Sequence, residues 1–376
     1  MAYVYFNTGS PTGSGSWGTC NYWFCCPGGL QSKGSLPSVT DCVVLESNVC
    51  DLGTSNRCIA SICSTGKNIN VNKVLTLCGC TGGLPSCMTN GSIVGLQSCI
   101  VMTPNASLTV QNGTISGAGR IVTAGGTLNV CDSTIATGCV CNGAAGTVQF
   151  FNSTNNGTLI NASNSSSKIY INNSVNCGTI CGGTTNANNV IVFSNSTNCG
   201  NICLGSSTSP GGVIFGCMPD DCSINCGSGS IGCFIFCGLS VNCGGVISSG
   251  NSLSYLFYNS SINCSCVGYL KSICFFDNST NEGCLCAGTN CAWFTGNAIN
   301  CGFITASRAC FLDNAENQCS VSTTCNFFIS TSINSGSACA VTVNLFCDSA
   351  TNFEVISAGT ISSSGNYFKI CSAVAK

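Results

Sequence analysis

The chain has 376 residues, a formal net charge of −2 and only 6% charged residues, against about 25% in an average soluble domain. Its 10 lysines and arginines stand singly along the sequence, which excludes the clustered basic surface of a nucleic-acid-binding protein. No run approaches the about 18 apolar residues that a membrane-spanning helix needs, so no membrane span is expected.

Residues 1–50 do not follow the repeat described below and are expected to form a non-repeat N-terminal cap or docking segment. They contain Trp17 and Trp23, followed by a Leu-Pro turn and an Asp before a Val-Val strand. A stack of coils needs such a cap to cover its open end. The first residues have no basic region and no long apolar run, so a Sec signal peptide is not expected.

Residues 51–148 are expected to form irregular β-solenoid coils. Apolar and polar residues alternate in residues 107–110, 126–130 and 146–150, between glycine-rich turns, which is typical of strands with one buried face. The glycines of residues 113–119 resemble a phosphate-binding loop, but the lysine and the strand-to-helix context of such loops are missing. No cofactor is therefore expected.

Residues 149–356 carry a regular repeat anchored on asparagine. Most steps between anchors are 17 to 22 residues, and one step is longer because residues 217–221 are inserted. A period near 20 residues is too short for a pair of packed helices and suits one coil of short strands. The anchors are Asn155, Asn176, Asn198, Asn225, Asn242, Asn263, Asn281, Asn300, Asn317, Asn334 and Asn352.

Three further columns keep register with these anchors. Two places before each anchor the residue is always Ser or Ala. Six places before, seven successive copies carry phenylalanine, namely Phe236, Phe257, Phe275, Phe294, Phe311, Phe328 and Phe346. One place after, six copies carry a cysteine, and these anchor cysteines are Cys177, Cys199, Cys226, Cys243, Cys264 and Cys301.

Each column is expected to become a continuous stack, because the coils of a solenoid lie about 4.8 Å apart. The phenylalanines should fill the interior, and the Ser/Ala column should lie where the coil wall is tight. Asn followed by Cys-Gly suits a turn, because Asn and Gly both tolerate left-handed backbone. Stacked Asn side chains can also bond amide to amide along the axis. The candidate site residues are therefore structural columns.

The repeat predicts an all-β fold, a single-stranded parallel β-solenoid (β-helix) of about 17–22-residue coils. Four segments are expected along the chain. They are an N-terminal cap over residues 1–50, irregular coils over 51–148, regular coils over 149–356 and a C-terminal coil or cap over 357–376.

Catalytic chemistry is not expected. Histidine is absent, which removes the commonest general base and excludes Ser-His-Asp and Cys-His mechanisms within one chain. The candidate acids are Asp220, Asp221, Asp277, Asp313 and Asp348. All but the first lie four places before an anchor, where other copies carry Asn or Gly. Because Asp, Asn and Gly share turn conformations, this column is interpreted as a turn position.

The 37 cysteines are an odd number, so at least one thiol is left over from internal pairing. Several form Cys-x-Cys pairs, and none forms the Cys-x-x-Cys spacing on which zinc ribbons and iron–sulfur sites rely, so no metal site is expected. Strand alternation places both members of a Cys-x-Cys pair on one face. Stacked cysteines are within the range of disulfides, which we expect in large number, although thiols packed as small apolar groups also fit.

The chain resembles a known group of proteins in two respects. Its repeat, with Phe, Ser, Asn and Gly columns, resembles the coils of β-solenoid surface and fibre proteins of phages, large DNA viruses and bacteria. Its N-terminal residues also resemble the entry pattern of that group, through Trp17, Trp23, Pro37, Asp41 and Val43 with Val44. The resemblance implies an external structural or attachment role.

The expected function is that of a non-enzymatic structural or attachment protein, a disulfide-stabilised rod-like β-solenoid on a virion. Its expected partners are further copies of itself or other particle proteins, and also host-surface glycans. It would be made in the cytosol without a Sec signal peptide and reside on a virion or extracellular particle. The alternatives are a prokaryotic extracellular adhesin or filament subunit, and a polysaccharide-acting β-helix enzyme, which would need two convergent acids.

Overall fold

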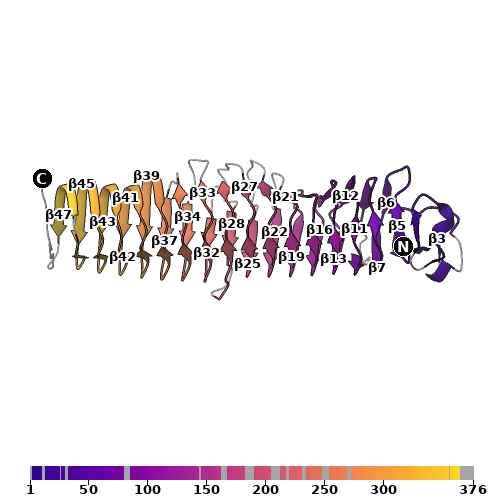
Figure 1. The fold of residues 1–376 in the computed structure, drawn as a ribbon, viewed down its shortest axis with the longest axis horizontal. Helices are drawn as coiled ribbons and strands as arrows, with labels where there is room; N and C mark the ends of the chain where they lie inside the picture. The colour runs from indigo at the N-terminus through magenta and orange to yellow at the C-terminus, as the bar shows by residue number, and fades with distance from the viewer. Residues whose placement is uncertain are drawn as a thin grey trace. The chain divides into compact units, whose positions relative to one another are not determined.

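The structure is a computed structural model that describes residues 2–10, 13–25, 27–29, 33–79, 85–143, 145–161, 167–182, 190–204, 212–216, 220–230, 234–247, 254–268, 272–354 and 356–364. The chain divides into two compact units. Unit 1 comprises Met1–Gly183 with Ala187–Ile191, and unit 2 comprises Thr184–Asn186 with Val192–Lys376. Each unit consists of β-strands stacked as successive coils (Figure 1).

The prediction of an all-β parallel β-solenoid is confirmed, with coils of about 20 residues. Each coil contributes three strands, which we call its first, second and third strand. Each strand pairs in parallel with the equivalent strand of the neighbouring coil, as the register of Leu128 with Leu108 and with Val148 illustrates. Within the described residues no helix is long and apolar enough to span a membrane.

The strands of unit 1 form three ladders. The first strands are β1 (Ala2–Phe6), β4 (Asp41–Leu45), β7 (Ser61–Thr65), β10 (Ser86–Thr89), β13 (Ser107–Gln111), β16 (Thr127–Cys131), β19 (Thr147–Phe151) and β22 (Lys168–Asn172). The second strands are β2 (Ser14–Ser16), β5 (Asn48–Asp51), β8 (Ile69–Asn70), β11 (Ile93–Val94), β14 (Thr114–Ile115), β17 (Thr134–Ile135), β20 (Thr154–Asn155) and β23 (Val175–Asn176). The third strands are β6 (Arg57–Ile59), β9 (Leu75–Leu77), β12 (Cys99–Met102), β15 (Arg120–Val122), β18 (Cys139–Asn142), β21 (Thr158–Asn161) and β24 (Ile180–Gly182).

Unit 2 repeats this plan, and β25 (Val190–Ser194) joins it from Val192 onward. Its next first strands are β28 (Gly212–Phe215), β31 (Phe234–Phe236), β34 (Ser254–Phe257) and β37 (Ser272–Phe275). Its second strands are β26 (Thr197–Asn198), β29 (Ile224–Asn225), β32 (Val241–Asn242), β35 (Ile262–Asn263), β38 (Thr280–Asn281), β40 (Ile299–Asn300), β42 (Glu316–Asn317), β44 (Ile333–Asn334) and β46 (Thr351–Asn352). Its separate third strands are β27 (Ile202–Leu204), β30 (Gly229–Ser230), β33 (Val246–Ile247) and β36 (Val267–Gly268).

In the last coils of unit 2 the third strand runs directly into the first strand of the next coil. These merged strands are β39 (Leu285–Phe294), β41 (Ile304–Phe311), β43 (Val321–Phe328), β45 (Ala338–Cys347) and β47 (Ile356–Ser364). Three of the pairings between them shift register at the corner, for example between Ala287 and Cys291 where β39 pairs with β41. The shift accommodates a different number of residues at the corner of the two paired strands, four steps from Ala287 to Cys291 opposite two from Ala306 to Arg308.

The N-terminal end of unit 1 is closed by residues that precede the second coil. Strand β1 pairs in parallel with β4 and antiparallel with β3 (Trp23–Phe24), next to the short 3₁₀ helices η1 (Cys20–Tyr22) and η2 (Pro27–Gly29). Trp17 and Trp23 are fully buried, and the Trp23 indole N–H donates to the Trp17 carbonyl over 2.9 Å. Residues 2–16 therefore already supply strands to the ladders, while the expected segment boundaries stay predictions.

The interiors of the two units differ in the side chains that fill them. Inward positions in unit 1 are mostly aliphatic, as with Leu128 and Val130 on β16. In unit 2 the inward column of the first strands is phenylalanine from Phe193 onward, and each ring stacks on the next. Both fillings bury apolar surface without adding polar groups to satisfy.

Candidate functional site

The predicted phenylalanine column lies in the interior of unit 2. Every member from Phe236 to Phe346 is at most 2% exposed. Ring centroids of successive members are 4.6–4.9 Å apart, and the rings are tilted by at most 10° from one another. This spacing equals the distance between neighbouring strands, so each ring packs on the same ring of the next coil.

The anchor asparagines form a buried amide ladder beside that column. In unit 2, each Nδ2 group from Asn198 to Asn334 donates to Oδ1 of the next anchor over 2.6–2.9 Å. Most also donate to a main-chain carbonyl two residues further along their own coil, as Asn281 does to Gly283 over 2.9 Å. In unit 1, Asn155 donates to Asn176 over 2.7 Å in the same way.

The expectation that these asparagines occupy turns is wrong. Each anchor of unit 2 is the second residue of a two-residue strand, and its side chain points inward. Several anchors are followed two places later by a glycine that lies close to the neighbouring coil, because a Cβ on Gly244 would collide with the carbonyl oxygen of Gly227. Left-handed backbone occurs instead four places before the anchor, for example at Asn259 with φ 57°.

The Ser/Ala column is buried where the coil wall is tight. Ser261, Ser279, Ala298 and Ala315 are all 0% exposed. The hydroxyl groups of Ser261 and Ser279 have no hydrogen-bond partner, and the hydroxyls of two further members, Ser240 and Ser332, share this state. In these coils the position selects for small volume, since alanine occupies it in neighbouring coils, whereas the hydroxyl of the earlier member Ser223 donates to the Phe193 carbonyl over 3.0 Å.

The candidate acids do not form one site. Asp277, Asp313 and Asp348 have left-handed backbone and are exposed, which agrees with their interpretation as turn residues. Asp221 departs from that interpretation, because it is 2% exposed and φ is not positive there. Its carboxylate accepts hydrogen bonds from the Asn195 main-chain N–H over 2.5 Å and from two serine hydroxyls, so it holds the turn of the neighbouring coil.

The anchor cysteines lie outside, next to the buried amide ladder, and all six are exposed. In unit 2, Cys226, Cys243 and Cys264 stand on three successive coils, and Cys301 follows two coils later. Burial against neighbouring atoms raises the pKa of the Cys264 thiol to about 11, with further contributions from Cys243 and Glu282. The Cys264 side chain is therefore a neutral thiol near pH 7.

The disulfides expected from the sequence are not formed among the cysteines that the structure describes. Some cysteine pairs nevertheless lie close together in unit 1. The two sulfurs of Cys139 and Cys141 are 3.5 Å apart on the outward side of β18, and the sulfurs of Cys58 and Cys78 are 2.7 Å apart on neighbouring coils. Burial, together with Cys141, raises the pKa of Cys139 to about 12. In the part of the chain that the structure describes, no three cysteine or carboxylate side chains gather as a metal site. Cys80, a member of one Cys-x-Cys pair, lies outside the described residues.

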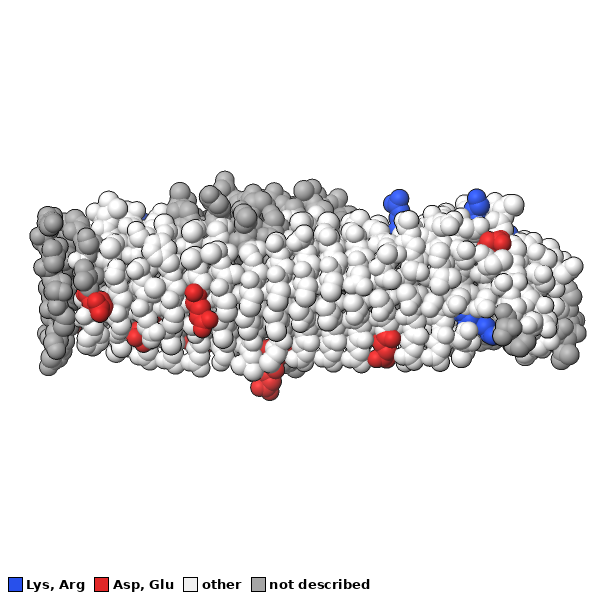
Figure 2. Space-filling model, viewed as in Figure 1, with Lys and Arg blue, Asp and Glu red and all other residues white. Residues whose placement is uncertain are grey.

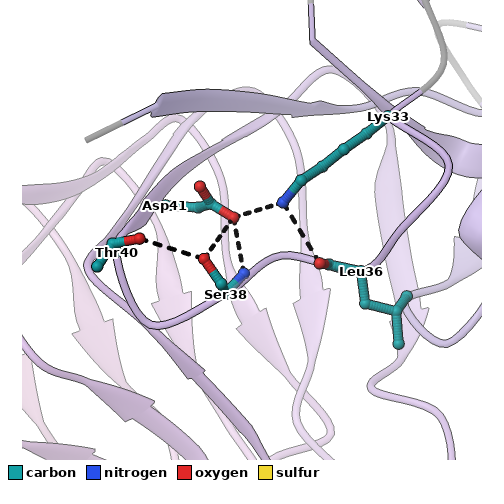
Figure 3. Close-up of polar contacts among 5 residues, drawn as sticks. All are labelled: Lys33, Leu36, Ser38, Thr40 and Asp41. Atoms are coloured by element: carbon teal, nitrogen blue, oxygen red, sulfur yellow. Dashed lines mark hydrogen bonds and ion pairs between the residues drawn. The ribbon is translucent and has the colours of Figure 1, made fainter.

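A charged pair fastens the entrance to β4 in unit 1. Lys33 donates to the Asp41 carboxylate over 2.5 Å and to the Leu36 carbonyl over 3.3 Å, while Ser38 donates to Asp41 from both its N–H and its hydroxyl (Figure 3). Burial by itself raises the pKa of Asp41, but the hydrogen bonds from Lys33 and Ser38 outweigh it and hold that pKa below its usual value. The group orders the loop that leads into the coil and offers no open ligand position.

Comparisons with protein-family models, with curated proteins and with solved structures find no significant match for this chain.

Proposed function

We propose that the chain is a non-enzymatic structural or attachment protein, displayed on a virion as a fibre, spike or capsid-associated component. The carrying observation is the amide ladder from Asn198 to Asn352 beside the stacked phenylalanines. These interior side chains bind each coil to the next. Such a plan makes an extensible scaffold, because each added coil buries the ladder of the one before it.

The placement of the acids supports a role without catalysis. Asp277 and Asp313 share a column, but the coil of Gly296 lies between them. Both are exposed residues with left-handed backbone at turns. A polysaccharide-acting enzyme on this fold needs two carboxylates that converge on one bond, with a cleft between them.

The surface supports a role in assembly. Figure 2 shows that charged side chains on the visible face stand apart from one another among uncharged neighbours. A surface with so few charges is poorly suited to a freely dissolved monomer and suits one covered by partners. The partners we propose are further copies of the chain or other proteins of the same particle, and glycans of a host surface.

Fractionation of the source material tests this proposal. Virions or extracellular particles are purified, the chain is quantified by mass spectrometry, and antibodies against it are used for immunogold electron microscopy. The expected result is many copies per particle, with gold on the particle surface. Recovery of the chain only from the cytosolic fraction would refute the proposal, as would polysaccharide cleavage that is lost in a double Asp277→Asn and Asp313→Asn variant.

A further inference from the structure

The outward side of the first strands in unit 2 carries a continuous apolar column. Residues paired directly from coil to coil are Leu256, Cys274, Trp293, Cys310, Phe327 and Leu345. Trp293 is 37% exposed, and Cys310 beside it is 5% exposed. Over six successive coils this column holds no polar or charged side chain.

Apolar side chains flank this column on the turn side as well. The rings of Tyr258 and Phe276 stack with centroids 4.8 Å apart, and Leu312 and Ile329 continue the row after Thr295. Between this row and Trp293 lies a surface pocket of about 210 Å³, with Phe327 and Arg308 also in its lining. We call the surface formed by this row and by the column from Leu256 to Leu345, on β34, β37 and the first-strand parts of β39, β41, β43 and β45, the apolar face.

The same position in unit 1 shows that the fold does not require apolar residues there. On β13, β16 and β19 the corresponding outward column reads Thr109, Asn129 and Gln149. Asn129 donates to Thr109 over 3.2 Å, so the polar side chains pair along the ladder. These three side chains are partly exposed, as Cys274, Phe327 and Leu345 are in unit 2. The apolar character of unit 2 therefore serves something other than the stacking of coils.

We infer that the apolar face binds the apolar face of a second copy of this chain. This inference rests on the proposed structural role and names the surface that performs it. Successive coils of the face are about 4.8 Å apart, and a second copy has the same spacing. Each coil of one copy can therefore contact the equivalent coil of the other. Large apolar patches on soluble proteins mark interaction sites, and homodimer interfaces are the more apolar kind.

The charges at the margins of the face select one arrangement. Arg308 stands at one margin, and Asp313 follows Leu312 at the other margin of the same coil. Among the described residues the one ion pair is that of Lys33 and Asp41, so none of those residues provides a carboxylate partner for Arg308. A two-fold axis parallel to the stacking direction exchanges the two margins and brings each Arg308 beside Asp313 of the other copy. A two-fold axis along the strands would instead set equal margins against each other.

The thiols of the face suit an apolar contact. Burial raises the pKa of Cys274 to about 11 and that of Cys310 to about 12, in both cases with a contribution from Cys291. Both side chains are neutral near pH 7 and behave as small apolar groups.

Sedimentation velocity of the full chain, with reductant present, measures the assembly. The wild-type chain is expected to sediment with twice its monomer mass of 38.2 kDa. Trp293→Asp places a charge at the centre of the face and is expected to yield monomers. Asn129→Asp is the matched control in the outward column of unit 1 and should leave the dimer intact. Circular dichroism confirms that each variant keeps its strands.

A charge exchange tests the proposed symmetry. Arg308→Glu and Asp313→Arg should each raise the dimer Kd at least about tenfold, which corresponds to about 1.4 kcal/mol. The double variant should restore the wild-type Kd. A double variant as weak as the single ones overturns the arrangement.

A monomeric wild-type chain, or a dimer that withstands Trp293→Asp, overturns the inference that this face is the contact. Neither result bears on whether the chain resides on particles, which fractionation and immunogold labelling decide separately.

Discussion

Removing one amide from the buried ladder tests whether the ladder holds the coils together. Asn281 accepts from Asn263 over 2.8 Å and donates to Asn300 over 2.7 Å and to the Gly283 carbonyl over 2.9 Å. Asn281→Ala removes all three bonds. The Asn263 amide keeps its bond to the Ser265 carbonyl, whereas the Asn300 side-chain oxygen and the Gly283 carbonyl lose these partners. An orphaned buried group costs about 1–3 kcal/mol, so the expected loss in free energy of unfolding is about 2–6 kcal/mol.

The chain offers a matched control in a second amide ladder that is exposed to water. Asn297 donates to Asn278 over 3.1 Å and accepts from Asn314 over 3.3 Å, at the turns that precede the anchors of three successive coils, beginning with the coil of Asn281. Water replaces these bonds when they are lost, so Asn297→Ala should change the free energy of unfolding by no more than about 0.5 kcal/mol. The two variants remove the same chemical group from two ladders that differ in burial.

Urea unfolding and amide hydrogen exchange together provide the measurement. A solenoid can unfold coil by coil, so the exchange of amides in β38 and β40 is compared with that of amides in distant coils. Asn281→Ala is expected to lower the urea midpoint and to lose protection first in those two strands. If the two variants lie within about 1 kcal/mol of each other, the ladder is not a main source of stability.

Four further outcomes are expected. Phe294→Ala should lower the free energy of unfolding by about 3–5 kcal/mol, because it leaves a cavity in the stack. Phe303→Ala, at a residue that is 42% exposed, should lower it far less. Equal melting temperatures of the two variants would contradict the stacking argument. Ser261→Ala should stabilise unit 2 by about 1 kcal/mol, because it removes a buried hydroxyl without a partner and Ala298 already fills the same column; a lower melting temperature would indicate a bond that the hydroxyl makes. The Asp41 carboxylate has a lowered pKa in the folded state. The ionised carboxylate therefore stabilises the fold above the unfolded pKa of about 3.9, and this stabilisation is lost as pH falls through the folded pKa. The difference in free energy of unfolding between wild type and Asp41→Asn should close in acid, and a difference independent of pH would contradict this. Protein taken from its native particle and denatured without reductant should leave most cysteines closed to alkylation, and stoichiometric zinc or iron released at that step would contradict a structural role for them.

The sequence predicted the inward columns well because they repeat one residue type. Phe257 and Phe275 lie six places before their anchors, and in the structure they stack in the interior. The register of four columns over many copies fixed the period of the coil, and the period fixed the class of fold. The amide ladder was expected for the same reason, since any column of asparagine in a stacked fold brings amides within reach of one another.

The local backbone of the anchor was not predictable from the same pattern. Asn followed by Cys-Gly has the composition of a turn, yet Asn263 lies in a strand and the turn residue is Asn259. A buried asparagine is stable in a strand only because the next coil supplies its partners, and that partner is about 20 residues away in sequence. The prediction that Asp221 is a turn residue failed for a related reason, because its carboxylate accepts a hydrogen bond from the turn of the preceding coil at Asn195.

The outward columns were missed because their members differ in kind. Cys274, Trp293 and Phe327 share only apolar character, so no single residue type repeats. A weaker signal was present, since runs such as residues 234–236 are apolar at every position and do not alternate. Continuous apolar runs are typical of strands buried on both faces, which agrees with the second copy that we infer to cover the apolar face.

Inward and outward columns therefore carry separate tasks in this chain. The inward asparagine and phenylalanine columns recur with little change and join coil to coil, while the outward position changes from Thr109 in unit 1 to Trp293 in unit 2 without altering the strand pairing. Because stacking does not depend on the outward residue, that residue is free to specify a partner. A solenoid of this kind gains a binding surface by substitution along one column, and it keeps its fold as long as the ladder inside remains intact.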